Sequence, residues 1–203
     1  MSNDPRQTAL WTLNALEGAS ATLDRVMAAA FEAAPQLDRR DRALANALVY
    51  GVQRWRGRLD WIIGHFSRTP LTRMDPAIRN LLRLGLFQIA FMERIPVSAA
   101  VNTAVEMAKQ TAAPWAARFV NGVLRNAARG LEKVPYPDLS ADPVGAIAAS
   151  RAFPRWLVKR WLRRFGVQET LALCDAANTI PPVTLRTNTR SEEHTSELQS
   201  PNT

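Results

Sequence analysis

The chain has 203 residues, of which 47% are hydrophobic and 22% are charged. This composition is typical of a globular protein with one main core, and it excludes a disordered chain. No uncharged apolar run approaches the roughly 18 residues that a membrane span needs. Asp4, Arg6 and Glu17 stand where a secretory signal would be apolar. We therefore expect a cytoplasmic protein without a membrane partner.

Basic residues outnumber acidic ones by 26 to 18, and 23 of the basic residues are arginine. Because the planar guanidinium group binds phosphate with two hydrogen bonds, this excess indicates a nucleic-acid partner. Codon usage in a GC-rich genome would raise the arginine count without any such function. The positions of the arginines along the predicted helices must therefore decide between the two explanations.

Apolar residues recur at helical spacing through the first two thirds of the chain. Helix starts, each an Asp N-cap before a Pro, are predicted at Asp4-Pro5, Asp75-Pro76 and Asp142-Pro143. The helices predicted are two short ones on either side of Gly18, then 38–56, 59–66, 77–92, 97–108 and 119–127. The apolar helix 77–92 belongs in the middle of a bundle, and Gly122 leaves a gap for a neighbouring helix. Residues 1–133 are thus expected to form an all-α domain of about six or seven helices.

The composition changes after residue 133, where Pro135, Pro137 and Pro143 interrupt the helical pattern. We assign residues 134–150 to an interdomain linker. Beyond it, residues 154–165 are amphipathic, residues 171–177 look helical, and residues 183–187 alternate as a strand does. Residues 151–190 are therefore expected to be the incomplete start of an α+β subdomain.

The sequence offers no convergent set of catalytic or ligand-binding groups. His65 and His194 are too far apart to suggest a metal site, and a single cysteine leaves no disulfide and no zinc cluster. No glycine-rich phosphate loop occurs. Cys174 lies on a predicted apolar face, so we interpret it as a buried structural thiol rather than a nucleophile. We predict no catalytic, metal-binding or cofactor-binding residue in this chain.

Two stripes of cations follow helical faces and supply the candidate RNA-binding residues. The first stripe is Arg118, Arg125 and Arg129, which return to nearly the same angle of a helix. The second is Arg155, Lys159 and Arg163, with Arg160 and Arg164 beside it, and Arg186 in the predicted strand completes the set. A stripe of one sign repels itself unless an anion compensates. Long cationic side chains also cover solvated faces without binding RNA, and that interpretation stays open.

A further basic and aromatic patch surrounds Trp55, which stands between Arg54 and Arg56 with Arg58 close by. An indole ring in such a setting is suited to stacking on a base. The same pattern fits a tryptophan that belongs to the hydrophobic core. Both interpretations are kept.

The run Leu84–Lys109, followed by Arg118–Asn126 with the sequence RFVNGVLRN, resembles the hallmark of the NusB-like helical domain. Asp41–Gly51 agrees with it. Antitermination factors of the NusB type end soon after this helix, whereas this chain continues through Phe153–Val158 and Pro181–Asn188. That continuation resembles the RsmB-type ribosomal RNA small subunit methyltransferases. The resemblance covers nearly all of residues 5–190.

The RsmB-type resemblance implies a parent enzyme that methylates cytosine C5 in small-subunit ribosomal RNA with S-adenosylmethionine. Two cysteines of a C-terminal domain act in that chemistry, and Cys174 matches neither of their motifs. The resemblance therefore implies an inactive chain that binds rRNA, whose other partner is the missing catalytic domain. The alternatives are an RNA-binding transcription antitermination factor of the NusB type and a helical protein-interaction module. Only Arg6 stands where antitermination factors have an arginine-rich opening, which weakens the first alternative.

The last 13 residues, 191–203, break with the composition of the rest of the chain. They hold three Glu and no Lys or Arg, whereas the other 190 residues hold 26 basic and 15 acidic residues. Residues 190–203 resemble the translation of a common short-read sequencing adapter. We therefore expect a tail without fold or function, joined where the native gene was cut. Sequencing the source DNA across the Arg190 codon checks this expectation.

Overall fold

The computed structural model describes residues 4–18, 20–110, 115–180 and 184. Within these residues the chain is all α-helical, without a strand. The helices are α1 (Pro5–Leu16), α2 (Leu23–Glu32), α3 (Arg39–Arg54), α4 (Arg56–Phe66), α5 (Pro76–Phe91), α6 (Val97–Lys109), α7 (Ala116–Gly130), α8 (Pro143–Arg151) and α9 (Arg155–Asn178), with 3-10 turns η1 (Leu71–Arg73) and η2 (Leu131–Lys133). The predicted all-α class is confirmed. The expected tail at 191–203 and, apart from Thr184, the expected strand at 183–187 with Arg186 lie outside the described residues.

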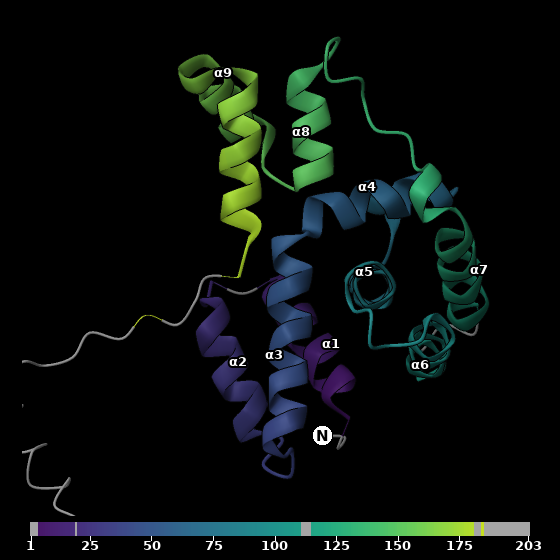
Figure 1. Cartoon of the computed structure of the whole chain (residues 1–203). Coiled ribbons are helices and arrows are strands. Elements are labelled where there is room, and N and C mark those ends of the chain that lie inside the picture. The colour runs from purple at the N-terminus through teal and green to yellow at the C-terminus, as the bar shows by residue number, and fades with distance from the viewer. Residues whose placement is uncertain (1–3, 19, 111–114, 181–183, 185–203) are drawn as a thin grey trace, which may run out of the picture.

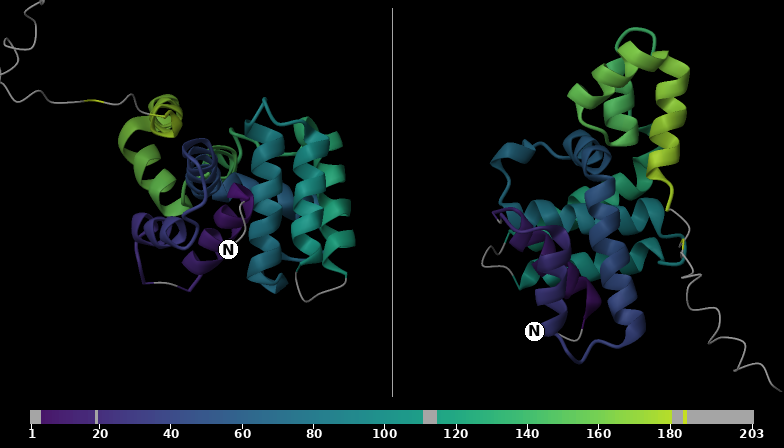
Figure 2. Two further views of the ribbon diagram at one scale, coloured as in Figure 1. Left: turned by 90° about the horizontal axis from the view of Figure 1, so that it is seen from below. Right: turned by 90° about the vertical axis from the view of Figure 1, so that its left-hand side faces the viewer.

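Helix α5 forms the centre of the first seven helices. It contacts α1, α3, α4, α6 and α7, and Figure 1 shows it end-on between the α1–α3 group and the α6–α7 pair. Leu81, Leu82 and Leu84 of α5 are fully buried, as expected of a helix that is apolar nearly all round. The view from below in Figure 2 shows α5, α6 and α7 side by side.

The three Asp-Pro pairs begin helices, as predicted. Each Asp accepts a hydrogen bond from a backbone N–H in the first helical turn, which has no partner within the helix. The bonds join Asp4 to the N–H of Arg6 (2.8 Å), Asp75 to that of Ala77 (2.7 Å) and Asp142 to that of Gly145 (2.8 Å). These local contacts explain why the helix starts could be read from the sequence.

Close packing of the central helices depends on Gly85, not on Gly122. A Cβ on Gly85 of α5 would lie 2.6 Å from Cδ1 of Leu124 in α7 and 3.4 Å from Cβ of Ala104 in α6. The prediction that Gly122 leaves a gap for a neighbour is wrong, because Gly122 is exposed and a Cβ there would meet no atom within 4 Å. Gly122 lies instead on the face of α7 that points away from α5 and α6.

Helices α8 and α9 form a second, smaller unit, which stands on the α4 side of the bundle in Figure 1 and in the right-hand view of Figure 2. Its core consists of Ile147, Val158 and Cys174, all fully buried. Cys174 is thus buried, as predicted. Burial, reinforced by the carboxylate of Asp175, raises the pKa of this thiol, so the reactive thiolate is disfavoured.

The segment 134–150, predicted as an interdomain linker, contains a helix in its second half. Pro143–Arg151 form α8, because the prolines that suggested a linker end where Asp142 caps a new helix. The first half is irregular and is attached to α4. There Nε1 of Trp61 donates to the carbonyl of Pro135 at 3.0 Å, and Nε of Arg58 donates to Oη of Tyr136 at 3.2 Å.

The α8–α9 unit also contacts the bundle directly. A Cβ on Gly57 of α4 would lie 3.2 Å from Cα of Ala152, so the two backbones meet closely there. Nη1 of Arg54 in α3 donates to the carbonyl of Asn178 at 3.4 Å. The second unit is therefore held at both ends of its chain rather than tethered by a free linker.

Helix α9 consists of two arms that meet at Gly166. The φ of Gly166 is 74° and its ψ is −178°, a conformation that only glycine adopts readily. The sequence predicted two helices, over 154–165 and 171–177, and the non-helical Gly166 separates two helical arms in the structure. The first arm, residues 155–165, carries the second cationic stripe.

Candidate nucleic-acid interface

The first cationic stripe lies on the outer face of α7. Arg118, Arg125 and Arg129 are all exposed. Nη2 of Arg129 donates to Oδ1 of Asn126 at 2.7 Å, and within the described residues none of the three arginines forms an ion pair. Arg125 and Arg129 also border a groove of about 380 Å³ between α6 and α7, which Ser98 and Asn102 line from the α6 side. This face presents guanidinium groups and neutral hydrogen-bonding groups together.

The second stripe lies on the first arm of α9. Lys159, Arg160, Arg163 and Arg164 are exposed, and no carboxylate of the described residues pairs with them. Arg155 differs, because its Nη2 lies 3.6 Å from Oδ2 of Asp142. The four unpaired cations therefore concentrate positive charge on one short helix without internal compensation.

The structure does not bring the two stripes onto one continuous surface. Helix α7 contacts α4, α4 contacts α8, and α8 contacts α9, so α4 and α8 stand between the stripes. Figure 1 shows α7 and α9 on opposite sides of the molecule. A ligand that touched both stripes would have to extend past α4 and α8, which separate them.

The basic patch around Trp55 belongs to the fold. The Trp55 ring stacks on Phe91 with a centroid distance of 4.8 Å, and the guanidinium of Arg58 lies over the rings of Trp55, Phe91 and Tyr136. Nη2 of Arg56 lies 3.7 Å from Glu17. The core interpretation of Trp55 is therefore supported, because the partly buried ring packs against the main core.

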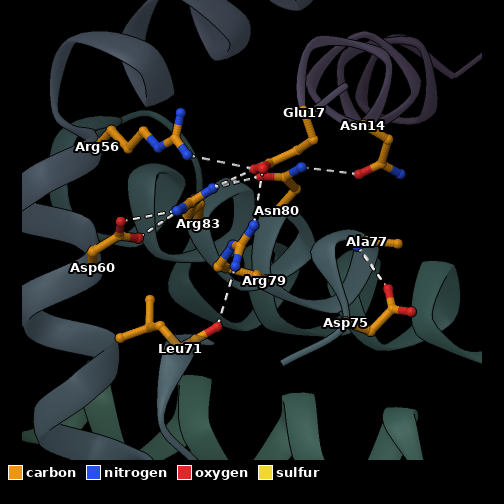
Figure 3. A network of polar contacts seen from close by, with 10 residues as sticks. All are labelled: Asn14, Glu17, Arg56, Asp60, Leu71, Asp75, Ala77, Arg79, Asn80 and Arg83. Carbon is orange, nitrogen blue, oxygen red and sulfur yellow. Dashed lines mark hydrogen bonds and ion pairs between the residues drawn. The ribbon is translucent and has the colours of Figure 1, made fainter. Parts of the chain in front are cut away.

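A buried arginine network under α1 and α4 was not predicted from the sequence (Figure 3). Arg83 is only 3% exposed, and its guanidinium holds Asp60 with two hydrogen bonds of 2.7 and 2.8 Å. It also donates to Glu17 at 2.9 Å and to Asn80 at 2.8 Å. Arg79 reaches the other carboxylate oxygen of Glu17 at 2.9 Å. The signal that could have predicted this network is the presence of Arg79, Asn80 and Arg83 inside an apolar helix.

Glu17 is the acceptor that α5 shares with its neighbours. Burial alone would raise its pKa, but the charges of Arg79 and Arg56 and the hydrogen bond and charge of Arg83 outweigh burial. The pKa of Glu17 is consequently lowered from its ordinary value of 4.5. The carboxylate therefore stays ionised in the folded chain and joins α1 to α5.

Arg6 is likewise committed to the fold, since its Nε donates to Oε1 of the buried Gln88 at 2.8 Å. Arg6 is the one arginine of α1, and an RNA contact by this helix would need it, but its side chain is bound to Gln88. The opening helix therefore contributes no free arginine to a ligand surface.

An exposed tryptophan accompanies the second stripe and was missed in the sequence. Trp156 of α9 is 67% exposed, more than any other tryptophan of the chain. The sequence signal was the position of Trp156, since it falls on the cationic rather than the apolar side of a helix with 3.6 residues per turn.

The described residues contain no cluster of His, Cys, Asp or Glu that could hold a metal ion. None of the described helices is long and apolar enough to cross a membrane.

Comparison with known proteins identifies the two parts of the chain. The NusB family model matches residues 3–129, and the model of the Methyltr_RsmF/B-like, ferredoxin-like domain matches residues 153–200. Ribosomal RNA small subunit methyltransferase B of Pseudomonas putida is 35% identical over 187 residues, which cover 92% of this chain and 41% of that protein. The probable ribosomal RNA small subunit methyltransferase B of Bacillus subtilis is 38% identical over 153 residues, which cover 75% of this chain and 34% of that protein. The chain thus spans well under half the length of these relatives.

A solved structure supports the fold of the first part. The structure of T. maritima NusB superposes with a TM-score of 0.56 at 22% identity, covering 64% of this chain and 91% of that chain. The first family match ends within α7, and the second begins just before α9. The chain therefore belongs to the NusB family, and its residues 153–200 are similar to the ferredoxin-like domain of RsmF/B-like methyltransferases.

Proposed function

We propose that this chain is the RNA-binding part of an S-adenosylmethionine-dependent methyltransferase that modifies cytosine C5 of small-subunit ribosomal RNA. The observation that carries the proposal is the face of α9 with Lys159, Arg160, Arg163 and Arg164 exposed and unpaired. Uncompensated cations on one face are the electrostatic signature of a phosphate-binding surface. The similarity to enzymes named for ribosomal RNA supports the choice of RNA. The stripe of Arg118, Arg125 and Arg129 on α7 would supply a second contact.

The methyl-donor chemistry belongs to the part of the relatives that this chain does not span. S-adenosylmethionine is held in such folds by a glycine-bearing turn between a strand and a helix. The described residues contain no strand, so they offer no such turn and do not fit the cofactor. We expect no saturable signal when the purified chain is titrated calorimetrically with micromolar S-adenosylmethionine. A saturable isotherm would contradict this assignment.

The RNA proposal is tested by the salt dependence of binding. Phosphate contacts release counterions, so about four contacts predict a slope near −3 in a plot of log affinity against log salt concentration. Reversal of Lys159, Arg160 and Arg163 to Glu should reduce the slope to about −1 and weaken binding to a fragment of small-subunit rRNA. Arg155 is left unchanged because Asp142 already pairs with it.

The matched control is reversal of Arg25, Arg39 and Arg40, which are also exposed, on α2 and α3. The net charge changes by the same amount in both triple variants, so a general charge effect would weaken binding equally. Equal losses, or a wild-type affinity that does not respond to salt, would assign the arginines to codon usage. Arg42 is unsuitable as a control, because its Nε donates to the carbonyl of Leu37.

The competing proposal is an RNA-binding antitermination factor of the NusB type. The match of residues 153–200 to a methyltransferase domain favours the first proposal, as does the inward contact of Arg6 with Gln88. The two differ in the part of the chain that binds RNA. A truncated chain ending at Lys133 would keep full affinity if the NusB domain alone were the RNA-binding module, and would lose the α9 contribution under our proposal.

A further inference from the structure

The first arm of α9 carries a large aromatic side chain near its start, on the same side as its cations. Trp156 is 67% exposed, whereas Trp161 on the same arm stacks edge-on against Phe153 at 5.3 Å and joins the small core. No hydrogen-bond or ring partner for Trp156 occurs among the described residues. The two tryptophans of one helical arm therefore have different environments, and only Trp161 is explained by packing.

Helical geometry places Trp156 among the cations rather than at the edge of the apolar face. At about 100° per residue, Arg163 lies about 20° from Trp156 and Arg160 about 40° from it. Lys159 lies about 60° away on the other side, and the buried Val158 lies about 160° away, nearly opposite. Trp156 thus lies near the start of the arm, on the same side of the helix as the unpaired cations, and points away from the core of the α8–α9 unit.

The chemistry of this face specifies its ligand. An exposed indole loses little water by stacking on another flat ring, and the surrounding guanidinium and ammonium groups attract phosphates. Bases of a duplex are already stacked and paired, whereas unpaired bases present a free π-face. A protein partner would bury four cations that lack a carboxylate among the described residues, which is costly without acidic groups on that partner. An unpaired stretch of nucleic acid satisfies both the ring and the charges.

We propose that Trp156 stacks on an unpaired base while Lys159, Arg160 and Arg163 contact the neighbouring phosphates. This inference rests on the proposed RNA-binding function and adds the class of RNA, which is single-stranded. The arm of α9 then selects an open loop or an unpaired strand of the ribosomal RNA rather than a helix. Discrimination comes from the ring, and most of the affinity at low salt comes from the cations.

The test measures binding of the 203-residue chain to a fluorescently labelled single-stranded RNA and to a duplex of the same sequence, by anisotropy. Trp156→Ala should weaken single-strand binding by about 5- to 160-fold, which is the range for loss of one stacked base. Trp156→Phe should keep most of the affinity, because its ring still stacks. Duplex binding should be unchanged in both variants. The salt slope of Trp156→Ala should equal that of the wild type, whereas Arg163→Ala should lower the magnitude of the slope by about 0.7.

Trp11→Ala is the matched control, since Trp11 of α1 is also exposed, at 41%, and has no cationic stripe beside it. The affinity of Trp11→Ala for both RNAs should equal that of the wild type.

If the wild type binds RNA with the expected salt slope but Trp156→Ala binds the single strand as tightly as the wild type does, the stacking proposal is overturned and the RNA-binding function stands. If the wild type binds no RNA, the proposed function itself fails. A last outcome concerns acrylamide quenching of Trp156 fluorescence. Trp156 could be shielded from acrylamide only when the remaining domains of a longer relative are present, while its replacement leaves the RNA affinity unchanged. The face would then be a protein interface, and the proposal would be overturned.

Discussion

Helix α5 and the first arm of α9 both carry cations about one helical turn apart, yet the two regions use them in opposite ways. Arg79 and Arg83 of α5 lie under α1 and α4, where Glu17 and Asp60 accept their hydrogen bonds. Arg160 and Arg163 of α9 are exposed, and no carboxylate of the described part of the chain pairs with them. The comparison teaches that the carboxylates within reach, rather than arginine number or spacing, decide whether a guanidinium stabilises the fold or stays available to a ligand.

Removal of the buried partner should give the largest effect. Arg83→Ala leaves Asp60 and Glu17 without their principal donor in a largely buried site, and we expect it to lower the free energy of unfolding by about 3–5 kcal/mol. Arg163→Ala on α9 should change it by less than about 0.5 kcal/mol. Urea denaturation followed by circular dichroism measures both. Similar losses in the two variants would remove the distinction between structural and available arginines.

The shape of α9 can be tested at Gly166, where an alanine would have to adopt a φ of 74°. Because that region strongly disfavours a Cβ, Gly166→Ala should destabilise the α8–α9 unit by about 1–3 kcal/mol. The control is Gly122→Ala on α7, where a Cβ meets no atom, and which should stabilise the helix by up to about 1 kcal/mol. The rate of thiol labelling at the buried Cys174 reports opening of the α8–α9 unit. Unchanged labelling in Gly166→Ala would show that the bend is not required.

A smaller effect should appear in the pH dependence of stability. The folded pKa of Glu17 is lowered from 4.5, so its contribution is fully present above pH 4.5 and is lost as the pH falls through the folded value. Glu17→Gln should therefore be less stable than the wild type at neutral pH and should lose less stability on acidification. Thermal melts between pH 7 and pH 3 measure the difference. Parallel curves for the two proteins would show that Glu17 is not stabilised by α5.

The fold was predictable to the extent that its signals are local. The Asp-Pro starts and the apolar spacing of α5 depend on residues within one helix, and the structure confirms both. The segment 134–150, predicted as an interdomain linker, contains α8, which begins at the predicted Asp142-Pro143 start. The gap expected at Gly122 was wrong, because the close approach at Gly85 depends on Leu124 and Ala104, both distant in the chain.

The candidate interface could be predicted as a set of cations but not as a site. Helical spacing placed the stripes of α7 and α9 on helix faces, and both are exposed in the structure. Spacing alone gave no reason to separate Arg155, which lies near Asp142, from the four cations that follow it. It also gave no means of placing Trp55 against the core, where its ring stacks on Phe91 and the guanidinium of Arg58 lies over it.

The sequence by itself determined the helices, most of their starts, the excess of arginine and the resemblance to NusB-like domains. Each of these depends on neighbouring residues or on an ordered motif. Only the tertiary structure decided which basic residues are paired and which are available. Arg83 and Glu17 are 66 positions apart, and the ring of Trp55 stacks on Phe91, which is 36 positions away. The pairing of a charge and the burial of a ring depend on groups brought together by folding, and no local pattern specifies them.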